Sequence, residues 1–167
     1  MKKKIIIGVT GFLGLFFLFL VWFEYTYSMD TIQGFEQGDS ESSMQILVAS
    51  QGSEYKIEVV DGILNEFADE DVYFNVIDVS SLEEVNPDEW SAVILLHTWE
   101  IFEPEENSEE FIKAHYTPEK VFVVTTSGFG NKQIKGVDGI TGPSKIDQVD
   151  RHVEEITECI NSIIEAN

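Results

Sequence analysis

The sequence predicts an α/β domain built on a doubly wound, five-stranded parallel sheet of order 2-1-3-4-5, preceded by one N-terminal transmembrane helix. Two patterns predict the domain. Short β-branched runs alternate with helical patterns, and residues 91–96 and 120–126 are continuously apolar, as in strands covered on both faces. This alternation implies right-handed crossovers and a parallel sheet between two helical layers. A third pattern, the uncharged run at residues 5–23, predicts the helix.

The N-terminal run has the length and the flanks of a membrane anchor. Lys2, Lys3 and Lys4 precede 19 uncharged residues, and aromatic residues and Glu24 follow them. A helix rises 1.5 Å per residue, so roughly 20 apolar residues cross a hydrocarbon core about 30 Å thick. A cleaved secretory signal is the alternative, but its apolar part is usually shorter and it ends at a small-residue cleavage site. We therefore expect residues 1–23 to be an uncleaved anchor that contacts lipid through residues 5–23.

Charge orients this anchor and excludes one class of partner. All 31 acidic residues follow Phe23, where only seven Lys or Arg residues accompany them, so this part has a net charge of −24. Lys and Arg are enriched on cytoplasmic flanks, which predicts a single-pass protein of the cell membrane with its N-terminus inside and its domain outside. Nucleic acid is excluded as a partner, because binding phosphates requires a cationic surface. Solubility through self-repulsion is the simplest explanation of the acid excess.

A change of composition marks the domain boundary. Residues 24–43 are rich in Ser, Gly, Gln and acid without a sustained hydrophobic period, which predicts an acidic flexible linker. Residues 44–167 have the length of one domain. Cys159 is the only cysteine, so an intrachain disulfide is impossible. A packed, inert thiol is expected there, with an intermolecular bridge or a reactive thiol as the alternatives.

Within the domain, the elements follow from hydrophobic periodicity. The expected strands are short and mostly β-branched, and they occupy residues 45–50, 72–79, 91–96, 120–126 and 136–141. The expected helices have apolar residues three or four positions apart, and they occupy residues 54–67, 107–115 and 144–166. Residues 81–88 should form only a short helix or turn. Pro143 and Ser144 are expected to open the last helix, with Ser144 as a plausible cap.

Three loops are candidates for a binding site. In such a sheet, ligands bind outside the carboxyl ends of the strands, where the strand order reverses. The loops expected there begin at residues 50, 97 and 127. The first and the third combine glycine with hydroxyl side chains, and the second offers Trp99.

These loops resemble those of the flavodoxin family. The turn at residues 50–53 looks like the family's phosphate loop, Thr98-Trp99 looks like the Thr-Trp often found after its third strand, and residues 126–130 look like its second flavin loop. The resemblance covers residues 44–167, although the phosphate loop is divergent, with two hydroxyls followed by Glu54. It implies that the cofactor is FMN. The residues it assigns to FMN binding are Ser50, Gly52 and Ser53 at the phosphate and Thr98, Trp99, Ser127, Gly128 and Phe129 around the ring.

Physical arguments leave alternatives open at the same positions. Free N–H groups and the positive end of a helix make residues 50–53 a natural anion site, but Ser53 could simply cap the helix. Trp99 could stack on a planar ligand or cover the mouth of the sheet. His97 could titrate near neutrality or serve as a hydrogen-bonded structural residue. Four lysines lie in or beside these loops and form either a cationic rim or a scattered set: Lys56, Lys132, Lys135 and Lys145.

Other functions of doubly wound domains fit worse. A response-regulator receiver needs acidic residues where Ser50 and His97 stand, and a dinucleotide site needs a Gly-x-Gly-x-x-Gly motif where only Gly52 is present. A Gly-x-Ser-x-Gly elbow is absent, and no Cys/His pair suggests a zinc site.

Two functions therefore remain. The first is a membrane-anchored flavodoxin-like domain that binds FMN for electron transfer with a redox partner. The second is a non-catalytic interaction module on the same fold that has lost the cofactor and binds another protein. A reductase is a third, weaker possibility, so whether the protein is an enzyme stays open and no residue is assigned a catalytic role.

Overall fold

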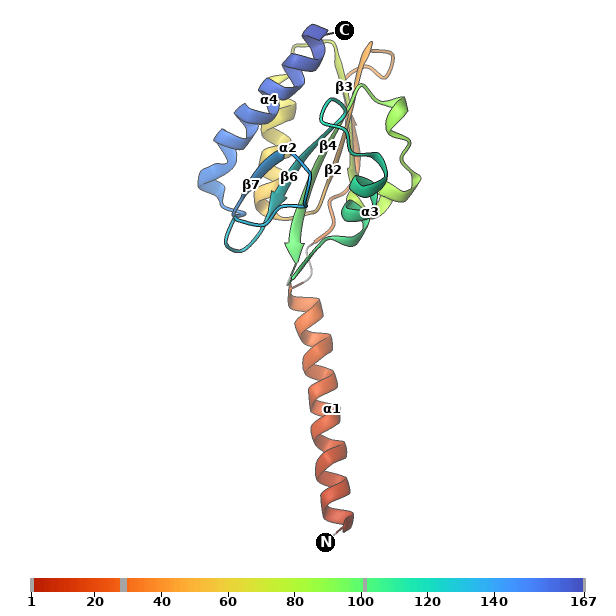
Figure 1. Ribbon diagram of the computed structural model, residues 1–167, viewed down its shortest axis with the longest axis vertical. Helices are drawn as coiled ribbons and strands as arrows, with labels where there is room; N and C mark the ends of the chain where they lie inside the picture. The colour runs from red at the N-terminus through yellow and green to blue at the C-terminus, as the bar shows by residue number, and fades with distance from the viewer. Residues whose placement is uncertain (1, 28–29, 101, 167) are drawn as a thin grey trace.

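The protein consists of an N-terminal helical rod and an α/β domain (Figure 1). The computed structural model describes residues 2–27, 30–100 and 102–166. The rod is α1, Lys2–Tyr27, and its segment Lys2–Trp22 is long and apolar enough to cross a membrane, with none of it buried. The helices of the domain are α2 (Glu54–Glu66), α3 (Glu106–His115) and α4 (Val149–Ala166), with short 3-10 helices η1 (Val79–Glu84), η2 (Pro87–Glu89) and η3 (Ile146–Gln148).

The centre of the domain is a mostly parallel sheet. Its strands are β1 (Phe35–Gln37), β2 (Met44–Ser50), β3 (Val72–Asp78), β4 (Ala92–Glu100), β5 (Glu103–Pro104), β6 (Val121–Thr126) and β7 (Gly139–Gly142). The five predicted parallel strands are present in the order β3-β2-β4-β6-β7. The predicted count is wrong, because β1 adds antiparallel to β3 and β5 adds antiparallel to β4, which makes seven strands.

Two hydrophobic clusters cover the sheet, one on each face. Alternate residues of β2 divide between them, so that Ile46 and Val48 face α2 and α4 while Leu47 and Ala49 face η1 and α3. Because both faces are covered, the central strands are apolar without interruption, as the sequence predicts. The core therefore holds the parallel strands β2, β4 and β6 so that their carboxyl ends lie at the same edge of the sheet.

Two predicted boundaries were wrong. β4 continues four residues beyond the expected end at residue 96, because His97 and Thr98 still pair with Thr125 and Thr126 of β6. The last helix begins at Val149 rather than at residue 144, since the chain first makes the η3 turn, and Ser144 therefore does not cap it.

The segment expected to be a flexible linker has structure of its own. Residues 24–27 continue α1, and β1 forms a three-residue antiparallel pair with β3. The Gln37 side chain donates a hydrogen bond to the Leu64 carbonyl at 2.9 Å, and the Ile32 N–H donates to the Asp78 carboxylate at 3.0 Å. Composition alone suggested a tether because these contacts are made mainly by backbone and polar groups, which leave no hydrophobic period.

The pairing of β1 with β3 and the hydrogen bonds of Ile32 and Gln37 predict that residues 30–43 stabilise the domain. A fragment of residues 44–167 should unfold in urea with a free energy about 2–4 kcal/mol lower than a fragment of residues 30–167, because several hydrogen bonds are lost. Unfolding followed by far-UV circular dichroism measures the difference. Equal midpoints and slopes for the two fragments would show that the segment adds nothing.

Candidate functional site

The carboxyl ends of four parallel strands form one edge of the sheet, which we call the carboxyl edge. Register pairs Ser50 with Leu96 and Thr98 with Thr126, and β7 ends beside β6 at the same level. The turn at residues 50–53, the end of β4 at residues 97–100 and the loop at residues 127–131 are thus brought to one edge. The structure places the expected site residues Ser50, Gly52, Ser53, Thr98, Trp99 and Ser127 there, and Gly128 and Phe129 are the next residues of the third loop.

The hydroxyls of the first loop have partners within the loop. Ser50 is fully buried, and its hydroxyl donates to the Gln51 carbonyl at 3.0 Å. The Ser53 hydroxyl accepts from the Lys56 N–H at 3.3 Å and is the N-cap of α2. The capping alternative considered for Ser53 is therefore the one that the geometry supports.

The N-terminal segment lies on the same loop. The Gly52 N–H donates to the Asp30 carbonyl at 2.5 Å, and Thr31 forms an isolated antiparallel bridge with Gln51. A Cβ atom on residue 52 would lie 2.4 Å from the Thr31 carbonyl oxygen, so only glycine permits this approach. The backbone of residues 30–31 thus covers the turn and takes the Gly52 N–H.

The Gln51 side chain joins the first loop to the end of β4. Its amide oxygen accepts from the Thr98 N–H at 2.8 Å, and its amide nitrogen donates to the Glu100 carboxylate at 2.9 Å. Sequence reasoning did not single out Gln51. A polar residue directly after a buried strand at the expected switch point was the available signal.

Lys56 points into the protein, whereas both alternatives considered for the four lysines, a cationic rim and a scattered set, would leave it exposed. Its side chain is fully buried, and its Nζ donates to the Thr98 hydroxyl at 2.5 Å, which in turn lies 3.0 Å from the Thr126 hydroxyl. Burial lowers the pKa of Lys56 to about 8, against a weaker opposing effect of Glu100. The helical spacing from Lys56 to Val60 and Ile63 placed it on the buried face and could have predicted this.

His97 has the features of a structural histidine. It is fully buried, and its Nε2 lies 2.9 Å from the Thr125 hydroxyl. Burial, and secondarily the charge of Lys56, lowers its pKa to about 4. The imidazole is therefore neutral at physiological pH, which argues against titration near neutrality.

Of the remaining predicted site residues, Trp99 and Ser127 are at least partly buried, and Gly128 and Phe129 are exposed. Trp99 is partly buried, with the Lys132 Nζ 5.6 Å from its ring centroid, a cation–π geometry. Ser127 is buried, and neither its hydroxyl nor the Trp99 indole N–H has a hydrogen-bond partner among the described residues. Gly128 is exposed, and Phe129 is 93% exposed and contributes nothing to a pocket wall.

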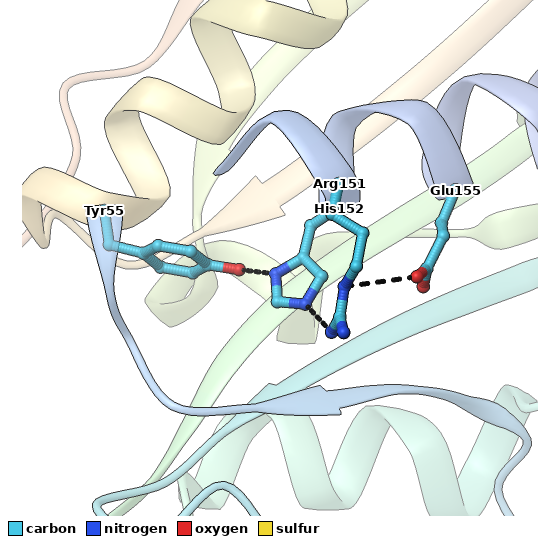
Figure 2. A network of polar contacts seen from close by, with 4 residues as sticks. All are labelled: Tyr55, Arg151, His152 and Glu155. Carbon is cyan, nitrogen blue, oxygen red and sulfur yellow. Dashed lines mark hydrogen bonds and ion pairs between the residues drawn. The ribbon is translucent and has the colours of Figure 1, made fainter. Parts of the chain in front are cut away.

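A second polar network fastens α4 to the start of α2 (Figure 2). Figure 2 shows the Tyr55 hydroxyl hydrogen-bonded to His152 Nδ1, Arg151 at 2.8 Å from His152 Nε2, and an Arg151–Glu155 ion pair of 3.4 Å. Because arginine can only donate, His152 Nε2 must accept, and Nδ1 carries the proton. Burial, aided by Arg151, lowers the pKa of His152, and burial raises that of Tyr55 to about 12. With His152 and Tyr55 uncharged and Arg151 paired with Glu155, this network is a structural clamp beside the carboxyl edge.

FMN does not fit the first loop as it is folded. A phosphate at this turn needs free N–H and hydroxyl donors, and the Gly52 N–H and the Ser50 hydroxyl are both engaged. The Ser53 hydroxyl accepts in the N-cap of α2 and keeps its own O–H free, but the adjacent Glu54 carboxylate is exposed in the first turn of that helix and would repel a phosphate. Among the described residues, no group of three or more His, Cys, Asp or Glu side chains could hold a metal ion. Burial raises the pKa of Cys159, which disfavours its thiolate.

The comparisons with known proteins concern the fold. No protein-family model and no curated protein matches the chain. The metal-soaked Flv1 flavodiiron core from Synechocystis sp. PCC6803 superposes with a TM-score of 0.56 at 12% identity, over 76% of this chain and 38% of that one. The fold is flavodoxin-like. This chain therefore spans about two-fifths of the length of the flavodiiron core.

Two further solved structures share the flavodoxin-like description at lower similarity. A flavodoxin from the domain Archaea has 14% identity and a TM-score of 0.45, over 71% of this chain and 99% of that one. The FMN complex of general stress protein 14 from Treponema denticola has 6% identity and a TM-score of 0.35, over 73% and 96%.

The buried imidazole predicts an acid-sensitive stability. The folded pKa of His97 is about 4 against an ordinary 6.5, so the unfolded state binds the proton first as pH falls. Stability should drop by about 3 kcal/mol between pH 6.5 and 4, and His97→Gln should remove that part of the drop. Urea unfolding of both proteins at several pH values measures it, and parallel curves would contradict the assignment.

The buried ammonium predicts that Lys56→Met stabilises the domain at neutral pH. The folded pKa of about 8 lies below the ordinary 10.5, so burying the charged form costs free energy at pH 7 that disappears as pH rises toward 10.5. We expect a gain of about 1–3 kcal/mol at pH 7 that shrinks at alkaline pH. Chemical denaturation at pH 7 and pH 10 measures it. A loss of stability at pH 7 would show that the Lys56–Thr98 hydrogen bond outweighs desolvation.

Proposed function

We propose that the protein is a membrane-anchored, flavodoxin-fold interaction module that works without FMN. The observation that carries this proposal is the backbone of residues 30–31 on the Gly52 turn, which takes the N–H group that a phosphate would need. The Lys56 side chain points inward from the same turn and hydrogen-bonds to Thr98, so it offers no charge to a ligand outside.

The anchor is α1. Its span Lys2–Trp22 has the length and composition of a membrane crossing, and three lysines at its start favour a cytoplasmic N-terminus. The domain then lies outside as part of a single-pass membrane protein. Flavodoxin-like electron carriers usually work in the cytoplasm, so this location also favours a function other than electron transfer.

The surface chemistry specifies the partner that such a module would bind. The residues after Phe23 carry a net charge of −24, so a basic protein surface is complementary. A groove of about 710 Å³ between α2 and α4 is lined by apolar side chains such as Val149 and Val153 and by four carboxylates: Glu66, Asp150, Glu154 and Glu158. A basic segment with a few apolar side chains matches both features.

FMN-dependent electron transfer is the competing function, and a flavin assay separates the two. The full chain purified in detergent should be colourless and should leave the fluorescence of added FMN unquenched, because the Gly52 N–H and the Ser50 hydroxyl are engaged within the protein. A fragment of residues 34–167, which lacks the covering segment but keeps β1, is the matched comparison. A flavin spectrum in the full chain would overturn the proposal. Binding by the fragment alone would show that residues 30–31 are a removable cover over an intact FMN site.

A further inference from the structure

The path of the chain ties the carboxyl edge to the end of the membrane helix. Asp30 and Thr31 are held on Gln51 and Gly52 at this edge, and α1 ends at Tyr27. Two residues separate Tyr27 from Asp30, and three Cα–Cα steps of 3.8 Å reach at most about 11 Å. In Figure 1 the arrow of β4 accordingly points to the end of the domain from which α1 extends.

This short connection leaves little space between the edge and the bilayer. The candidate span ends at Trp22, and the five helical residues from there to Tyr27 rise about 8 Å. The headgroup region on one side of a bilayer is about 5–8 Å thick. The carboxyl edge is therefore held within about 11 Å of the headgroup surface, a gap no wider than a single helix of about 10–12 Å. Lipid headgroups fill such a gap more readily than a folded partner does.

The exposed apolar side chains of the domain gather at that edge. Outside α1, the three most exposed large hydrophobic residues of the described chain are Phe129 at 93%, Phe102 at 83% and Ile146 at 53%. Phe102 lies in the β4–β5 hairpin, Phe129 follows β6, and Ile146 follows β7, so all three lie beyond carboxyl ends of strands. Strands about 4.8 Å apart place the loops after β6 and β7 about 10–15 Å to the side of the Gly52 turn.

The loops after β6 and β7 also carry cations and form one surface. Gly130, with φ of 66°, packs against Pro143, since a Cβ there would lie 2.6 Å from the proline ring. Lys132, Lys135 and Lys145 are all exposed, and the ion pairs recorded among the described residues use Lys113 and Arg151 instead. Asp138 and Asp147 are nearby acids, so the net excess of cations is small.

We propose that this surface, formed by Phe129, Ile146, Lys132, Lys135 and Lys145, rests on the phospholipid headgroups next to α1. Phe129 and Ile146 would enter the boundary between headgroups and acyl chains, and the lysines would contact lipid phosphates, as in interfacial amphipathic segments. Phe102 contributes less, because Glu100 and Glu103 flank it. The inference rests on the proposed membrane anchoring, and it gives the domain a fixed orientation with the carboxyl edge toward the lipid.

A depth measurement on the full chain in phosphatidylcholine–phosphatidylglycerol vesicles tests this orientation. A polarity-sensitive fluorophore is placed on Asn131→Cys in a Cys159→Ser background, with Ser40→Cys at the opposite end of the sheet as the control. Doxyl-labelled lipids should quench the Asn131 probe roughly two- to fivefold more than the Ser40 probe. Equal quenching of the two probes would overturn the proposal.

Substitutions in the full chain then identify the groups responsible. Phe129→Ser combined with Ile146→Ser should lower quenching of the Asn131 probe to the control level, and Lys132→Glu with Lys135→Glu should lower it in phosphatidylglycerol vesicles above all. Phe35→Ser, a half-exposed residue on β1, is the matched control and should change nothing. Unchanged quenching in both multiple variants would also overturn the proposal. Carbonate extraction distinguishes failure of the proposed anchoring from failure of the proposed orientation. Loss of the chain from the vesicles would contradict the anchoring, whereas a retained chain with an unquenched probe would contradict only the orientation.

Discussion

The backbone of residues 30–32 packs against the turn after β2. This contact determines both the structure of the carboxyl edge and the point at which the chain leaves the domain toward α1. The Gly52 N–H bonds to the Asp30 carbonyl, and the Ile32 N–H bonds to the carboxylate at the end of β3. The first contact needs the close approach to Asp30 and Thr31 that a glycine at position 52 allows. One short segment thereby covers the turn where a flavodoxin-like fold would hold a phosphate, and it also fixes where the chain leaves the domain toward α1.

Beneath that cover, several polar side chains at the carboxyl edge hydrogen-bond to one another, whereas His97 Nδ1, the Trp99 indole N–H and the Ser127 hydroxyl have no partner among the described residues. Gln51 spans from the first loop to the end of β4, and Lys56 reaches Thr98, whose hydroxyl lies beside that of Thr126. Burying an ammonium without a carboxylate in direct contact is costly, and the lowered pKa of Lys56 expresses that cost. Gln51, Lys56 and Thr98 thus use donors and acceptors that a ligand of the first loop could otherwise use, which supports the proposal that the domain works without FMN.

The sheet was predictable because its signals are hydrophobic, whereas the hydrogen-bond partners at the carboxyl edge were not, because polar side chains leave no hydrophobic period. Continuous apolar runs at β4 and β6 fixed the parallel core, and the loops were correctly brought to one edge. β1 was missed, since its pairing with β3 is mostly backbone hydrogen bonding that composition does not reveal. Lys56 was placed on the rim by residue type, although its helical phase with Val60 and Ile63 put it inside. The residue types at positions 30 and 31 gave no signal that their backbone carbonyl groups would lie against Gly52.

The closed carboxyl edge and its short connection to α1 are consistent with two surfaces of different function, one at the carboxyl edge for lipid and one on α2 and α4 for a protein partner. In the proposed membrane-anchored arrangement, an edge held within about 11 Å of the headgroups would be poorly accessible to a protein partner. The helical face of α2 and α4 stands to the side of that edge and carries the acidic groove, so it stays open to a partner above the lipid. The exposed apolar side chains and the lysines after β6 and β7 would contact the bilayer, while the acidic groove on α2 and α4 would be repelled by lipid phosphates. Together with the short connection from Tyr27 to Asp30, these contacts would leave the helical face accessible to the proposed partner.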